Sequence, residues 1–168
     1  MKRYRVYYLI VLLAISYGRA QVFGFEEDRN LAMDTVEFNI DMKFYVHGIS
    51  TDTLFDYDRY IMVLGVPDQE IRGGLEIRAE FGCDDFILDY SGNSIWAGHC
   101  YLSDVILNER GISINGLEVG DSRQMVENLF KIDTENSSVV LIRWDALLII
   151  EFGDDDHIRR MCFSQRIT

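Results

Sequence analysis

The stretch VVLIRWDALLIIEF, from Val139 to Phe152, is the most apolar part of the chain after its first twenty residues. It is rich in β-branched and large aliphatic residues, which are typical of strands. Asp145 interrupts it, so we expect two strands, 139–144 and 146–152, joined by a tight turn. A polar turn at 153–156 separates them from a third expected strand, 157–164. Connections this short join antiparallel neighbours, and the last third therefore predicts an antiparallel meander.

Two helices are expected upstream of this meander. The first runs from Thr53 to Leu64, with Thr53 as its cap and Gly65 and Pro67 as its stop. The second follows Asp121, its expected cap, and buries a stripe that ends near Phe130.

The remaining segments alternate or carry apolar runs of strand length. Residues 69–74 are expected to form a loop, and strands are expected at 36–46, 75–81, 86–90, 95–101, 103–107 and 112–114. The order strand, helix, strands, helix, strands predicts an antiparallel α+β domain.

A hexamer recurs in the chain with little change. Residues 80–85 read EFGCDD and residues 151–156 read EFGDDD, and both follow an expected helix at a similar distance. We interpret this as a duplication that gives two tandem helix-plus-antiparallel-strand repeats in one two-layer domain. Repeat 1 covers about 35–107 and repeat 2 about 111–168, within a single domain at 35–168. The alternative is that a strand followed by a glycine and an aspartate turn recurs by chance.

The stretch GLEVGDS at 116–122, followed by Val126, Leu129 and Phe130, resembles the helix-start motif of β-lactamase-inhibitory-protein-like domains. Small outer-membrane assembly lipoproteins share that motif. The first half is similar in a degraded form, in the stretches TDT at 51–53 and VLGVPD at 63–68. The resemblance implies tandem two-layer modules whose sheet forms a concave face for protein binding, without catalysis or cofactor. The chain departs from it in lacking a lipidation cysteine, a Gly-Asp pair in the first half, and a glycine at Lys131.

Residues 1–20 are typical of a cleaved export signal. Three basic residues precede an apolar run of about a dozen residues, and Gly18-Arg19-Ala20 supplies small residues for cleavage. The alternative is an uncleaved membrane anchor, although the run is shorter than the roughly 20 residues that span a bilayer. We expect a flexible leader at 21–34 and a periplasmic or secreted protein with no stable membrane insertion.

The charge of the exported part is strongly negative. Removal of residues 1–20 leaves 12 basic and 28 acidic residues, a formal net charge of −16. Such a surface disfavours nucleic acid and attracts a partner protein with a basic surface. The alternative is that the charge only keeps the protein soluble.

Cys83, Cys100 and Cys162 are the cysteines of the chain. An oxidising compartment favours one disulfide, and Cys83–Cys100 is the candidate pair because we expect both on one sheet face. Pairing with Cys162, or three reduced thiols, remains open. The aspartates at 84–85 and 154–156 could bind calcium, but they are more typical of solvated turns, and no cofactor or metal is expected.

The candidate binding residues are Asp89, Trp96, Tyr101 and Trp144. If Tyr90 faces Ile95 in the expected hairpin, Trp96 lies opposite Asp89 on the sheet face away from the core. An aromatic ring beside a carboxylate suits a basic partner, and the alternative is that Trp96 fills a small second core.

No nucleophile–base pair, phosphate loop or zinc motif is present in the sequence. We therefore expect a non-catalytic binding module, which could act as an inhibitor. A structural subunit of an envelope assembly with apolar contacts along 139–150 is the first alternative. A carboxylate-based hydrolase of envelope glycans is the second.

Overall fold

The computed structural model describes residues 35–73, 85–98 and 100–165. By its internal contacts the chain divides into two units, Met1–Met33 and Asp34–Thr168, and every described residue belongs to the second. The expected signal at 1–20, the leader at 21–34, the strand at 75–81 and the first copy of the hexamer up to residue 84 lie outside the described residues.

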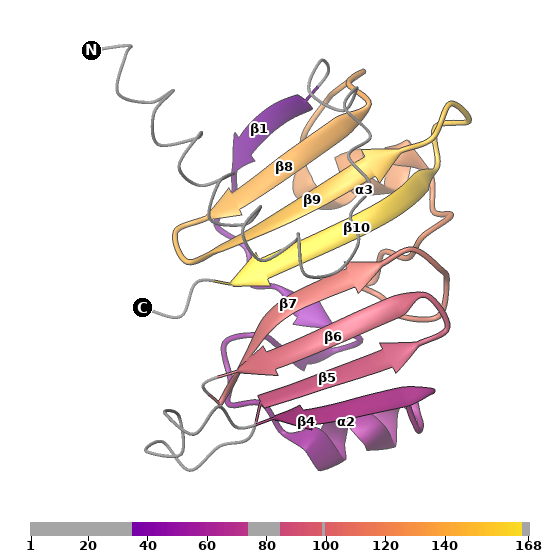
Figure 1. Ribbon diagram of the computed structural model, residues 1–168. Coiled ribbons are helices and arrows are strands. Elements are labelled where there is room, and N and C mark those ends of the chain that lie inside the picture. Colours follow the sequence, from indigo (N-terminus) through magenta and orange to yellow (C-terminus); the bar gives the residue numbers. More distant parts are fainter. Residues whose placement is uncertain (1–34, 74–84, 99, 166–168) are drawn as a thin grey trace. The chain divides into compact units, whose positions relative to one another are not determined.

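The core of the fold is one eight-stranded sheet (Figure 1). Its order across the sheet is β1-β8-β9-β10-β7-β6-β5-β4. The strands are β1 (Thr35–Asn39), β4 (Gln69–Gly73), β5 (Asp85–Tyr90), β6 (Asn93–Gly98), β7 (Tyr101–Leu107), β8 (Ser138–Arg143), β9 (Ala146–Phe152) and β10 (Ile158–Gln165). A separate two-stranded sheet pairs β2 (Tyr45–Val46) with β3 (Ile49–Ser50), and the helices are α2 (Tyr57–Leu64) and α3 (Arg123–Phe130).

The fold class expected from the sequence is wrong. The described residues form one large mixed sheet with two helices of eight residues each, a β-rich fold rather than two helix-plus-strand repeats. Two pairings cause the difference. β7 pairs antiparallel with β10 and so joins strands β4–β7 to strands β8–β10 in one sheet, and β1 pairs parallel with β8 across a large sequence separation.

One face of the sheet is covered by the helices and by the segments that connect them to the strands. Tyr60 of α2 and Val126 of α3 are buried against this face, and Phe44 packs edge-on against Phe163 with ring centroids 5.3 Å apart. These side chains meet the alternate residues of the strands, such as Leu88 and Leu148, which are fully buried. The hydrophobic core therefore lies between the sheet and a covering layer that is mostly loop.

The expected strand at 36–46 is confirmed only in part. The alternation of burial continues from Thr35 to Val46, but the hydrogen-bonded ladder of β1 ends at Asn39. The chain then leaves the sheet edge and continues through residues 40–44 to β2, so the alternation of burial persists between the two strands.

Helix α2 begins later than its sequence suggests. Asp56, not Thr53, is the cap, because the Asp56 carboxylate accepts a hydrogen bond of 3.1 Å from the backbone N–H of Arg59. The Thr53 hydroxyl instead donates to the carbonyl of Ser50. Gly65 ends the helix as expected, with a φ of 87° that suits glycine.

Helix α3 also has a different cap from the one expected. Ser122 holds the cap position, and the Asp121 carboxylate accepts from the backbone N–H of Glu118 at 2.9 Å and pairs with Arg110 at 2.9 Å. Backbone bonds of 2.7 Å link Gly120 and Asp121 to Ile158 at the start of β10. The Gly-Asp motif thus fastens the helix start to the sheet.

Three of the expected segments need correction. Residues 69–73, expected as a loop, form β4 and pair with β5, although this segment carries no apolar alternation. The expected strand 95–101 ends at Gly98, since Gly98 pairs with Tyr101 across a tight turn in which Cys100 has a φ of 67°. In the expected strand 112–114, Ile114 forms isolated bridges with Val46 and Leu117, and no strand is present there.

The residue that caps the C-terminus of α3 offers a test of backbone strain. Lys131 ends the helix in the left-handed region (φ 58°, ψ 42°), where a residue with a Cβ is strained. Lys131→Gly should raise the free energy of unfolding by about 0.5–1 kcal/mol in urea denaturation. Lys131→Ala is the matched control, because it removes the charge but keeps the Cβ. Equal stability of the two variants would show that the backbone is relaxed there.

Candidate functional site

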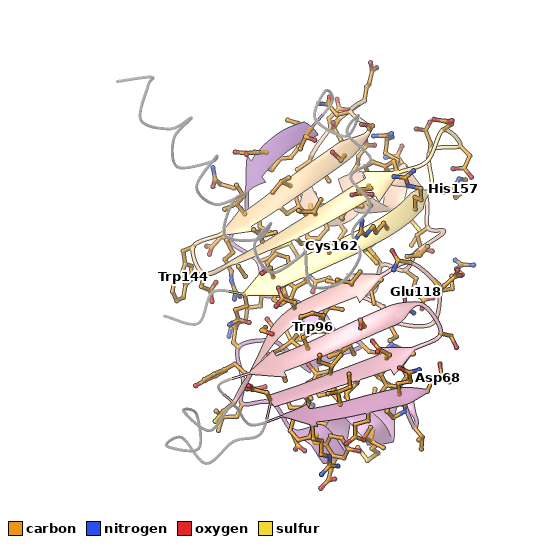
Figure 2. The ribbon with its side chains drawn as sticks, in the orientation of Figure 1. Asp68, Trp96, Glu118, Trp144, His157 and Cys162 are labelled. Carbon is orange, nitrogen blue, oxygen red and sulfur yellow. The ribbon has the colours of Figure 1, made fainter. Side chains whose placement is uncertain are left out.

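The most exposed large aromatic residue of the described chain is Trp144. It lies in the two-residue turn between β8 and β9, and 86% of its surface is exposed. Figure 2 shows it at the end of this hairpin, away from Trp96 in the body of the sheet.

One buried ion pair joins the residues on both sides of Trp144. Arg143 and Asp145 form a two-pronged pair, with 2.5 Å between Nε and Oδ1 and 2.8 Å between Nη2 and Oδ2. Both residues are buried. Burial lowers the pKa of Arg143, but the hydrogen bonds to Asp145 and Asp52 outweigh this effect and leave the pKa raised, so the guanidinium stays charged.

The same guanidinium ties the hairpin to the loop before α2. Arg143 Nη2 lies 2.7 Å from Oδ1 of Asp52, whose other oxygen is 3.6 Å from Lys43. Two residues further on, Leu54 forms an isolated bridge with Tyr101 at the start of β7. Trp144, Asp52, Leu54 and Tyr101 therefore lie at one end of the sheet, and we call them the Trp144 surface.

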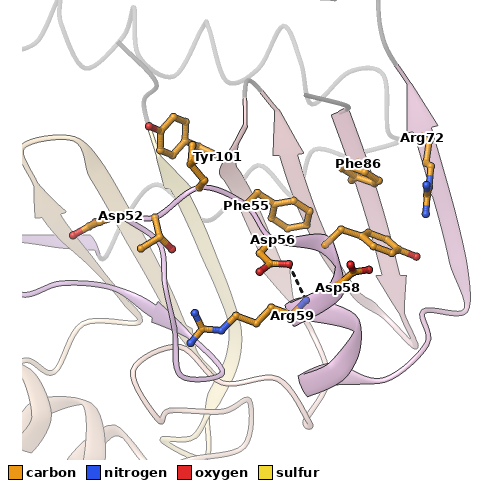
Figure 3. A pocket seen from close by; sticks show the side chains of 11 residues that line it. Asp52, Phe55, Asp56, Asp58, Arg59, Arg72, Phe86 and Tyr101 are labelled. Carbon is orange, nitrogen blue, oxygen red and sulfur yellow. Dashed lines mark hydrogen bonds between the residues drawn. The ribbon is translucent and has the colours of Figure 1, made fainter. Parts of the chain in front are cut away.

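A shallow depression of about 760 Å³ adjoins this surface (Figure 3). It is lined by residues 52–59 together with Arg72, Phe86 and Tyr101. Phe55 and Phe86 have ring centroids 5.6 Å apart, and Tyr57 stacks on Phe86 at 5.1 Å. The carboxylates of Asp52, Asp56 and Asp58 belong to exposed residues. The depression thus combines half-buried aromatic rings with exposed charges.

One polar cluster lies at the far end of the depression. The Tyr57 hydroxyl donates to Glu70 at 2.6 Å, and the Arg72 guanidinium pairs with Glu70 and lies 4.6 Å above the Tyr57 ring. Hydrogen bonds from Tyr57 and then Arg72 lower the pKa of the Glu70 carboxyl. Glu70 is therefore ionised at neutral pH, and the cluster is electrically balanced.

The predicted hairpin register is wrong by two residues. Asp89 pairs with Ser94, and Trp96 pairs with Ile87 rather than with Asp89. The cause is a two-residue turn at Ser91-Gly92, both with positive φ, where a four-residue turn was expected. A shift of two keeps each side chain on its face, so Asp89 and Trp96 still share the face away from the core.

Ser94 connects the two predicted binding residues on that face. Its hydroxyl donates to the Asp89 carboxylate and accepts from the Trp96 indole nitrogen at 3.3 Å. On the other side of Trp96 lies Asp104 of β7. The ring is half-buried and flanked by two carboxylates.

The four predicted binding residues thus fall on two surfaces. Tyr101 and Trp144 belong to the Trp144 surface. Asp89 and Trp96 belong to the sheet face away from the core, which we call the open face. The sequence analysis missed Arg143, Asp52 and Leu54. The alternation of Arg143 with Leu141 and Val139 on the core face was the signal that could have marked Arg143 as buried.

Cys100 is disulfide-bonded and Cys162 is free. Cys83, the predicted partner of Cys100, lies outside the described residues.

The acidic run at 154–156 forms a turn between β9 and β10. Asp155 accepts from the backbone N–H of His157 at 3.3 Å, and Asp156 pairs with Arg123 at 3.0 Å. Within residues 35–73, 85–98 and 100–165, no group of three or more metal-ligating side chains is arranged to hold an ion.

No family model and no curated protein matches the chain. A search of solved structures finds an extracellular protein containing an SCP domain from Bacillus anthracis str. Ames, at 8% identity and a TM-score of 0.35. The match covers 68% of this chain and 46% of that one, so the chain spans about half the length of that structure. None of the helices in the described part of the chain has the length and apolar character needed to cross a membrane.

The ion pair around Trp144 can be tested by substitution. Arg143→Gln leaves Asp145 buried without a counter-charge, and we expect the free energy of unfolding to fall by about 2–4 kcal/mol. Arg72→Gln is the control, because it removes an exposed ion pair and should have a far smaller effect. Urea denaturation of both variants gives the comparison, and equal losses would contradict a structural role for Arg143.

The reactivity of Cys162 tests its burial. Burial raises the pKa of this thiol to about 11, so little thiolate exists at pH 8. We expect alkylation by iodoacetamide at pH 8 to be roughly a hundredfold slower in the folded protein than in urea. Mass mapping identifies the modified residue, and the Cys162→Ser variant gives the background. Rapid labelling of the folded protein at Cys162 would contradict this.

Proposed function

We propose that the protein is an exported, non-catalytic protein-binding module that recognises a partner through the Trp144 surface. The observation that carries the proposal is the exposure of Trp144 between Arg143 and Asp145, which are joined by a buried ion pair.

A tryptophan in this position suits binding better than stability. Tryptophan is highly buried on average in folded proteins, yet this ring contributes little to the core. In protein interfaces, tryptophan is among the residues that most often carry the binding energy. Because the turn is fixed by Arg143 and Asp145, the ring loses little backbone freedom when a partner covers it.

The neighbouring side chains fit the same role. Leu54, 62% exposed, adds apolar area beside Tyr101, and Asp52 places a carboxylate at the rim. The formal charge of the whole chain is −12, which favours encounter with a basic partner. An inhibitory role would follow if the partner used the covered surface for its own activity.

Export is part of this proposal and rests on residues 1–20 of the sequence, with their basic start and short apolar run.

The second candidate is a structural subunit of an envelope assembly. The open face of β8 and β9 carries half-buried aliphatic side chains in alternate positions, among them Ile142 and Leu147. Such a face suits apolar contacts that depend little on salt. A hydrolase has no comparable support, because the carboxylates of the depression belong to exposed residues rather than to its floor.

The binding test first captures a partner, with the protein purified after expression of the full sequence as bait. Trp144→Ala should weaken binding of that partner by about tenfold or more. Met125→Ala is the matched control, because it removes an exposed apolar side chain from α3, and it should leave the affinity unchanged.

Two further measurements separate the candidates. Raising the salt concentration from about 0.05 M to about 0.5 M should weaken a charge-steered complex and leave an apolar assembly intact. An Asp89→Asn/Trp96→Phe double variant shows whether the open face contributes. Equal affinities of wild type and Trp144→Ala would exclude the Trp144 surface.

A further inference from the structure

Strand β4 is a sheet edge that nothing in the proposed function uses. It has a hydrogen-bonded neighbour, β5, on one side only among the described strands (Figure 1). All five of its residues are exposed, and it contains neither a proline nor a shift in register. Such an edge offers free backbone N–H and C=O groups to another strand.

The sequence of β4 is complementary to itself when read in the opposite direction. It reads QEIRG, with Glu70 and Arg72 on either side of Ile71. When two copies pair antiparallel about Ile71, all five residues are paired, and each Glu70 faces the Arg72 of the other copy. Opposite charges in directly facing positions stabilise a strand pair.

We propose that β4 pairs antiparallel with β4 of a second copy of this chain, about a two-fold axis at Ile71, to form a homodimer with one continuous sheet. The two copies use the same surface, as a closed symmetric dimer requires.

The side chains at this edge are already held in place. Glu70 accepts the Tyr57 hydroxyl at 2.6 Å, and Arg72 stacks 4.6 Å above the Tyr57 ring, so both charges are fixed on the α2 side of the sheet. Charges on an edge strand ordinarily deter pairing. A Glu and an Arg placed symmetrically about the centre instead favour an antiparallel strand with the same order of charges, which a second copy of β4 supplies.

Apolar surface adjoins the edge on both faces. Ile71 is 51% exposed and lies next to Ile87 on the open face, so the two-fold axis would bring two isoleucines together. On the other face, α2 is attached to β4 through the Tyr57–Glu70 bond and exposes Met62 and Val63. Burial of these side chains in a dimer would add to the strand pairing.

The opposite edge does not share this property. Strand β1 reads TVEFN, so antiparallel pairing about its central residue places Glu37 opposite Glu37. Like charges in facing positions destabilise a pair. The preference for β4 therefore follows from the order of its charges.

The test is a charge exchange, read by analytical ultracentrifugation at protein concentrations from about 1 μM to 0.5 mM. Glu70→Arg places four arginines at the axis, and Arg72→Glu places four glutamates there. Each variant alone should dimerise at least tenfold more weakly than the wild type. An equimolar mixture of the two should recover the dimer, because every arginine of one chain then faces a glutamate of the other. The double variant E70R/R72E should dimerise alone, and Trp144→Ala should dimerise like the wild type.

A wild-type protein that stays monomeric at about 0.5 mM overturns the proposal. So do single variants that dimerise like the wild type, or a mixture that fails to recover the dimer. Thermal unfolding checks that each variant is folded. The mixing experiment separates lost pairing from lost folding, because mixing leaves the substitution in each chain unchanged and a misfolded variant would not form a dimer in the mixture. Trp144→Ala tests partner binding but should leave dimerisation unchanged, so the dimer proposal and the partner-binding proposal can fail separately.

Discussion

The antiparallel pairing of β7 with β10 holds the structure together. It joins the strands that follow α2 to the strands that follow α3, and it places Leu107 opposite Met161 and Val105 opposite Phe163. All four side chains are buried. Full burial of such a side chain contributes about 1.5–3 kcal/mol, so this seam alone is comparable to the net stability of a domain, roughly 5–15 kcal/mol. The Trp144 surface depends on it, because its residues come from both sides of the seam.

The local parts of the fold could be predicted from the sequence, and the long-range parts could not. The expected strands 139–144 and 146–152 match β8 and β9 to within a residue, since their apolar composition and the break at Asp145 are local signals. The pairing of β1 with β8 and of β7 with β10 leaves no local signal. β4 was missed for a related reason, because an exposed edge strand does not need the apolar alternation that marks a half-buried one.

The candidate site shows the same division. Trp144 could be singled out as a large aromatic residue at a turn, but the contact of the neighbouring Arg143 with Asp52, which lies 91 residues away in the sequence, could not. For the hairpin that contains Asp89 and Trp96, the sequence predicted the correct sheet face for each side chain but the wrong strand register. Ser91 adopts a positive φ that favours glycine or asparagine, so its residue type does not indicate the tighter turn.

The position of β1 has a consequence for how the chain is completed during synthesis. β1 is the first of the described strands to be made, yet it pairs with β8, and the bonded hydroxyls of Thr35 and Ser138 are separated by 103 residues. Until β8 has been synthesised, β1 has no neighbour with which to form its ladder. The ladder of β1 therefore forms only after most of the described chain has been synthesised.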